Sequence, residues 1–134
     1  MANAFHLQII SPAKVVIDAH VPSAEIPGAE GDFGVLPGHS AFFSMLRAGV
    51  IDVTMSDGIR RRFFAATGYA DVTPEKCTVI SDHVQDLADI SVTEVEDALA
   101  AANTALAQAE TAVEREQATK LLQTAQALAS AIRA

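Results

Sequence analysis

Residues 50–65 read VIDVTMSDGIRRRFFA, and this stretch decides the fold class. Asp57-Gly58 stands at its centre and suits a tight hairpin turn, because glycine tolerates a positive φ. Val50–Met55 precedes the pair and Ile59–Ala65 follows it, so two antiparallel strands are expected. Arg60–Arg62 alternates between the two faces of the second strand. A solvated strand edge and a docking patch for an acidic partner are both open interpretations of these arginines.

Further short strands lie on both sides of this hairpin. Phe5–Ile9 alternates apolar and polar residues, which is typical of a half-buried strand. Tyr69–Val72 and Cys77–Ile80 flank Thr73-Pro74-Glu75-Lys76, in which the proline presets φ for a type I turn. Several strands at this spacing predict a β-sandwich or a barrel.

The composition changes near residue 90, where glycine and proline disappear and alanine, the best helix former, becomes dominant. Ser91-Val92-Thr93-Glu94 and Thr111-Ala112-Val113-Glu114 each match a capping box, which starts a helix. An apolar stripe follows the start of each helix. The first stripe is Val92, Val95, Leu99, Ala102 and Leu106, and the second is Leu121, Ala125, Leu128 and Ile132.

Two stripes with a helix start between them predict an antiparallel helical hairpin, and the alternative is one long helix. The expected fold is therefore mainly β and then α. It consists of an N-terminal β-sandwich over residues 1–87 and a C-terminal antiparallel two-helix hairpin over residues 88–134. Because alanine buries little area, we expect the hairpin to be the more mobile part.

Charge and cysteine usage exclude several classes of function. Nine basic residues face seventeen acidic ones, for a net charge of −8, which disfavours binding to nucleic acid or to anionic lipid. Cys77 is the only cysteine, so no internal disulfide forms and a reducing compartment is expected. Residues 1–10 lack a basic stretch followed by an apolar block, so no signal peptide is expected, and no apolar run reaches the roughly 18 residues of a membrane span. Any membrane association is expected to pass through another protein.

Residues 30–40, EGDFGVLPGHS, combine three glycines with a proline. They have the outline of a phosphate loop but lack its lysine. The four histidines, His6, His20, His39 and His83, show no metal-binding spacing, and Ser81, Asp82 and His83 alternate between strand faces. We therefore expect no catalytic, metal or cofactor site. The stretch instead predicts a stiff loop that presents Glu30, Asp32 and His39 to a partner.

The run Gly31–His39 resembles the G-x-x-G-x-x-P-G-H signature of the epsilon subunit of rotary (F-type) ATP synthases. Phe5–Pro12 is similar to the family's opening strand, Leu46–Ile51 to its L-x-x-G-x-I/V segment, and Gly68–Val79 to its last hairpin. The resemblance covers essentially the whole chain and includes the order of a sandwich followed by two helices.

The resemblance implies a non-catalytic subunit in the central stalk of a proton-translocating ATP synthase. Such a sandwich binds the gamma subunit and the ring of c subunits, and so couples ring rotation to ATP synthesis. The ring-facing residues carried over are Glu30, Gly31 and Asp32, and the gamma-facing residues are Ser11, His39 and Phe42. The implied location is peripheral, on the cytoplasmic face of the bacterial inner (plasma) membrane.

The helical region departs from the family in two respects. In many relatives the hairpin extends along gamma and blocks hydrolysis through basic residues that meet the alpha and beta subunits. Residues 91–134 here carry three basic and six acidic residues, which predicts a weak inhibitory grip. Some relatives bind ATP through I/L-D-x-x-R-A, whereas Val95–Ala100 has Leu99 in place of the arginine. ATP binding is therefore expected to be absent or weak.

Two other classes of protein fit the residues alone. One is a free-standing β-sandwich interaction module that folds and acts by itself. The other is a hydrolase that uses His83 or His39 and loses its activity when one histidine is replaced.

Overall fold

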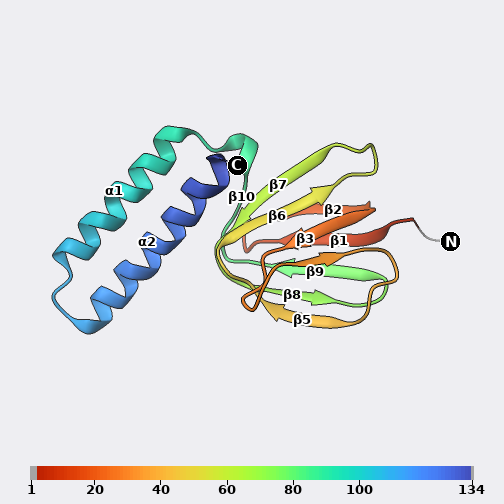
Figure 1. Cartoon of the computed structure of the whole chain (residues 1–134), viewed down its shortest axis with the longest axis horizontal. Helices are drawn as coiled ribbons and strands as arrows, with labels where there is room; N and C mark the ends of the chain where they lie inside the picture. The colour runs from red at the N-terminus through yellow and green to blue at the C-terminus, as the bar shows by residue number, and fades with distance from the viewer. Residues whose placement is uncertain (1–2, 134) are drawn as a thin grey trace. The chain divides into compact units, whose positions relative to one another are not determined.

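The computed structural model describes residues 3–133 of the chain. It divides the chain into two compact units, the first ending at Asp86 and the second beginning at Leu87. The first unit is built from strands and the second from helices (Figure 1).

The strand unit consists of two five-stranded sheets, ordered β2-β1-β9-β8-β5 and β10-β7-β6-β3-β4. The strands are β1 (Phe5–Ile10), β2 (Val15–Val21), β3 (Ser23–Ile26), β4 (Phe33–Val35), β5 (Phe42–Met45), β6 (Gly49–Thr54), β7 (Arg60–Ala65), β8 (Tyr69–Val72), β9 (Lys76–Ile80) and β10 (Val84–Asp86). The pairing is antiparallel except between β1 and β9, which run parallel. The sandwich that the sequence predicts is confirmed, and the barrel is not observed.

Both hairpins expected from turn chemistry are present. β6 pairs with β7 across the Asp57-Gly58 turn, where the Ile59 N–H donates to the Asp57 carboxylate at 2.9 Å. β8 pairs with β9 across the turn at residues 73–76. Strands β2, β3, β4, β5 and β10 were not predicted from the sequence. Most of them have only three or four residues, which is too short for a periodic pattern to be recognised.

The inner faces of the two sheets form the core of this unit. Alternate residues of each strand point inward, as the pleat requires. The fully buried members include Leu7 and Ile9 on β1, Val79 on β9, and Ile51 and Val53 on β6. Their burial fixes the register of the sheets, because a slip by one residue would expose the apolar set.

The second unit is an antiparallel helical hairpin with a short 3₁₀ turn, η1 (Leu87–Asp89), before it. α1 spans Val92–Gln108 and α2 spans Ala112–Arg133. The Ser91 hydroxyl accepts a hydrogen bond from the Glu94 N–H at 3.1 Å, and the Thr111 hydroxyl accepts one from the Glu114 N–H at 3.1 Å. Both predicted caps are thus confirmed, and the alternative prediction of one long helix is wrong. Neither helix is both long and apolar enough to cross a bilayer.

The two apolar stripes are right in part. Val95, Ala102, Ala125 and Leu128 are buried, whereas Val92 is 62% exposed and Leu121 is 57% exposed. Val92 is the first residue of α1. In α2, Leu121 lies on the same helix face as the buried Ala125 and Leu128, four and seven residues further on, but it is not buried itself.

Candidate functional site

The loop between β3 and β4, residues 28–32, is hydrogen-bonded to the end of β5 and to the segment that follows it. The Gly31 N–H donates to the Gly28 carbonyl at 3.1 Å, and the Ala29 N–H donates to the Met45 carbonyl at 2.8 Å. The Asp32 carboxylate pairs with the guanidinium of Arg47. We call these five residues the β3–β4 loop. Hydrogen bonds fix its backbone, and its last three residues belong to the stretch 30–40 that the sequence predicts to be stiff.

Glu30 and Asp32 differ in their surroundings although they are two residues apart. Asp32 is engaged by Arg47. Glu30 is exposed, and its carboxylate has no partner among residues 3–133. The loop therefore presents one free negative charge and not two.

His39 and Phe42 are positioned by the segment between β4 and β5. The His39 N–H donates to the Leu36 carbonyl at 3.2 Å, which closes a turn. The His39 ring meets the ring of Phe5 edge-on, with centroids 5.4 Å apart. Both ring nitrogens are buried and have no hydrogen-bond partner within the part of the chain that the structure describes. Phe42 meets Phe33 edge-on at 4.9 Å, so the end strands β4 and β5 of the two sheets approach each other.

Ser11 is not brought together with His39. His39 contacts Phe5 at the start of β1, and Ser11 follows the end of that strand. Six strand residues at about 3.3 Å each separate the two positions by roughly 20 Å. The Ser11 hydroxyl donates to the Lys14 carbonyl at 3.2 Å in a tight turn. Ser11 and His39 can contribute to one contact only if that contact runs along the sandwich.

An apolar surface that sequence reasoning largely missed lies on β5, an end strand of its sheet. Phe42, Phe43 and Met45 are 51%, 58% and 55% exposed, and we call these three residues the apolar edge. The Phe43 ring lies 5.3 Å from the ring of Tyr69 on β8. Of the three, only Phe42 was predicted from the sequence as a contact residue. The run FFSM could have drawn attention, because both faces of this strand carry large apolar residues.

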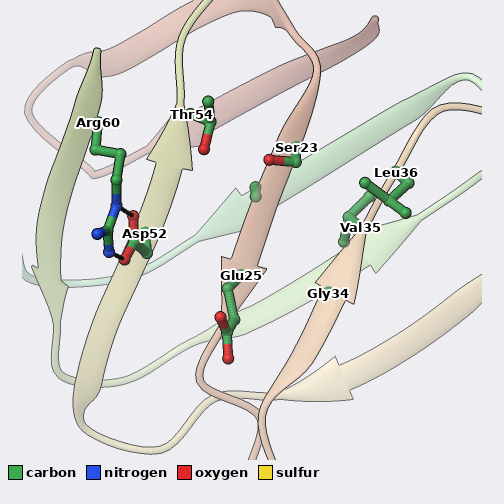
Figure 2. Close-up of a pocket in the computed structure, with 9 residues that line it drawn as sticks. Ser23, Glu25, Gly34, Val35, Leu36, Asp52, Thr54 and Arg60 are labelled. Carbon is green, nitrogen blue, oxygen red and sulfur yellow. Dashed lines mark hydrogen bonds and ion pairs between the residues drawn. The ribbon is translucent and has the colours of Figure 1, made fainter. Parts of the chain in front are cut away.

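A shallow hollow lies over the outer face of β3, β4 and β6 (Figure 2). The Arg60 guanidinium donates to Asp52 from two nitrogens, one of them at 3.1 Å, and this hydrogen bonding raises the pKa of Arg60. Glu25, an acid that would repel a phosphate group, lies in the same hollow. The hollow therefore lacks the chemistry of an anion site.

The arginine run forms ion pairs within the sandwich. Arg60 pairs with Asp52, whereas Arg61 donates to Asp86 at 3.0 Å and lies 4.9 Å above the Phe63 ring. The two side chains lie on opposite faces of β7, as alternation predicts. Both guanidinium groups have acidic partners within the sandwich, which agrees with the solvated strand edge, and the docking patch stays an untested prediction.

The side chains that could suggest a hydrolase are arranged otherwise. The buried Ser81 hydroxyl donates to the His83 backbone carbonyl at 3.0 Å, while the His83 ring lies 3.1 Å from the Gln85 amide oxygen. These contacts do not form a nucleophile–base pair, in which the hydroxyl would bond the imidazole. Burial raises the pKa of the Cys77 thiol to about 12, so this thiol is inert at neutral pH. Across residues 3–133, no group of three or more His, Cys, Asp or Glu side chains is placed to hold a metal ion.

Comparisons with known proteins point to one family. The profile described as "ATP synthase, Delta/Epsilon chain, beta-sandwich domain" matches residues 4–86. An ATP synthase epsilon chain of Granulibacter bethesdensis is 42% identical over 75% of this chain and 75% of its own length. One of Rhodospirillum rubrum is 35% identical over 98% of each chain. A chain in a structure of the Euglena gracilis mitochondrial ATP synthase shares the fold, with a TM-score of 0.86, 21% identity, and coverage of 98% of this chain and 83% of that one.

Proposed function

Since this chain belongs to the family of ATP synthase delta and epsilon chains, we propose that its sandwich joins the gamma subunit to the ring of c subunits. The chain is a non-catalytic subunit of the central stalk of an ATP synthase. In the proposed arrangement, the sandwich carries the rotation of the ring to gamma and thus to ATP synthesis. The observation that carries the proposal is an exposed apolar edge next to a hydrogen-bonded, polar loop on the same sandwich.

The gamma contact is assigned to the apolar edge together with Ser11 and His39. Three neighbouring residues of one end strand expose more than half of their surface, although an exposed apolar end strand favours aggregation unless a partner covers it. Aromatic side chains such as Phe42 and Phe43 are the kind that anchor protein interfaces. A subunit that stays bound to gamma would keep this edge out of water.

The ring contact is assigned to the β3–β4 loop, with Glu30, Gly31 and Asp32. A contact that transmits torque needs a loop that keeps its conformation under load. Two backbone hydrogen bonds and an ion pair hold the conformation of the β3–β4 loop. The exposed Glu30 carboxylate is its accessible polar group. The partner surface must then offer a hydrogen-bond donor or a cation.

The location and the role of the helices follow from the same assignment. We place the chain on the cytoplasmic face of a bacterial inner membrane, held there only through the complex, since the relatives named above at 35% identity or more are bacterial. The acidic balance of residues 91–134 leaves the hairpin few cations with which to grip the alpha and beta subunits. It is therefore a weak inhibitor of ATP hydrolysis at most.

The test is a tagged pull-down from native membranes in mild detergent, analysed by intact-complex mass spectrometry. One copy of this chain with gamma, the catalytic subunits and the c-ring is expected. The double variant Phe43→Ala/Met45→Ala should lose gamma. Val15→Ala is the control, because Val15 is 53% exposed on β2, the opposite end strand of the same sheet. Recovery of the wild-type chain alone would refute the stalk assignment and favour the free-standing module.

A further inference from the structure

We propose that Arg47 is a positioning residue for the β3–β4 loop, and that Asp32, which was assigned above to the ring contact with Glu30 and Gly31, acts on that contact through Arg47 and does not touch the ring. This inference rests on the proposed function, because it concerns the loop assigned to the ring. It gives the two acids of the loop different roles: Glu30 contacts the ring, and Asp32 helps to hold the loop in position.

Arg47 holds both ends of the loop. Its backbone N–H donates to the Pro27 carbonyl at 3.0 Å, just before the loop begins. Its side chain donates to the Asp32 carboxylate, where the loop ends, and to the Ala48 carbonyl at 3.3 Å. One residue between β5 and β6 thus fixes the distance between the ends of a loop that connects two other strands.

The middle of the loop is held by a different contact. The Ala29 N–H donates to the Met45 carbonyl at 2.8 Å, and Gly28 forms an isolated bridge with Leu46. These contacts use backbone atoms and are not made by the Arg47 side chain. The guanidinium therefore has one separable role, which is to hold the end of the loop at Asp32.

The charges of the loop support the same division of roles. The ion pair neutralises Asp32, whereas Glu30 is exposed without a partner among the described residues. If Arg47 were removed, Asp32 would become a second free carboxylate close to Glu30. The ring would then meet a loop with a different shape and with an additional negative charge.

The ion pair contributes little to the stability of the sandwich. The Arg47 and Asp32 side chains are 49% and 44% exposed, and ion pairs this accessible are weak because water screens them. Loss of the pair should therefore alter ring binding while the melting temperature stays nearly constant. That separation distinguishes a positioning role from a general structural one.

The experiment compares Arg47→Ala, Asp32→Asn and the double variant in binding to ATP synthase depleted of this chain. Each single variant should bind about threefold more weakly, the size expected of one exposed ion pair. The double variant should be no weaker than the singles, because both remove the same contact. The charge swap Arg47→Asp/Asp32→Arg should restore binding. Arg60→Ala is the matched control, since it removes an equal charge from an exposed ion pair of β7.

Hydrogen exchange of the Ala29 and Gly31 amides in the isolated chain gives a readout that does not need the ring. Both amides should exchange faster in Arg47→Ala, and their exchange rates should not change in Arg60→Ala. The inference is overturned if these amides do not respond. It is also overturned if Asp32→Asn weakens binding while Arg47→Ala does not, since Asp32 would then contact the ring directly. A wild-type chain that fails to bind the depleted synthase refutes the proposed function instead, and the amides still decide the role of Arg47.

Discussion

Replacing Gly68 by alanine should destabilise the sandwich more than the same change at any open turn. Gly68 precedes β8 with φ of +124°, and a Cβ atom there would lie 1.9 Å from the Ile80 carbonyl oxygen and 2.8 Å from the Ser81 Cα. Both neighbours are backbone atoms, so no side-chain rotation relieves the clash. The Gly68 carbonyl also accepts from the Leu46 N–H at 2.9 Å. Any shift at Gly68 therefore reaches the segment that contains Arg47.

Gly58 supplies the matched control. It also has a positive φ, +86°, but nothing lies within 4 Å of the position that a Cβ atom would take. Alanine at a positive φ costs about 1–2 kcal/mol, partly offset by the lower entropy of the unfolded chain. Gly58→Ala should thus cost about 1 kcal/mol. Gly68→Ala carries the same cost plus a backbone displacement, for a total of about 4 kcal/mol or more, which is in the exceptional range for single substitutions.

Urea unfolding measures both free energies of unfolding. The fluorescence of Tyr69, the only tyrosine in a chain without tryptophan, reports on the sandwich. The reasoning depends on the difference between the two variants, because only Gly68→Ala adds a clash with backbone atoms. Equal losses of unfolding free energy in Gly58→Ala and Gly68→Ala would refute this reasoning, because they would show that the contact with Ile80 relaxes at no cost.

Three further outcomes are expected. The raised pKa of Cys77, about 12 against about 9 for an exposed thiol, means that only the unfolded chain loses this proton between those pH values. The free energy of unfolding should therefore fall in that range by up to about 1.4 kcal/mol per pH unit more than in Cys77→Ala; parallel curves would contradict this. Amides of α1 and α2 should exchange faster than those of β1 and β9, because the buried hairpin side chains are mainly alanine; equal protection would rule out a mobile hairpin. Calorimetry with ATP should give no binding at millimolar concentrations, and a saturable heat would show that Leu99 does not abolish the site.

Local chemistry made the turns and helix starts predictable from sequence. Asp57-Gly58 closes its hairpin and Thr111 caps α2 with atoms that lie within three residues of each other. Such contacts form wherever the residue types occur at the right spacing. The break between the helices, the caps and the strands of the two hairpins are all of this kind.

The tertiary structure decided which of these residues form a surface. Arg47 and Asp32 are fifteen positions apart and meet only because β3 and β5 end beside each other. The exposure of Phe43 and Met45 follows from the position of β5 at the end of its sheet. No local sequence pattern predicts which strand will lie at the end of a sheet. Ser11 and His39 are separated because they lie at opposite ends of β1. Strand order is set by the burial of the whole core, which sums contacts between residues distant in sequence, whereas turns and caps depend on neighbours alone.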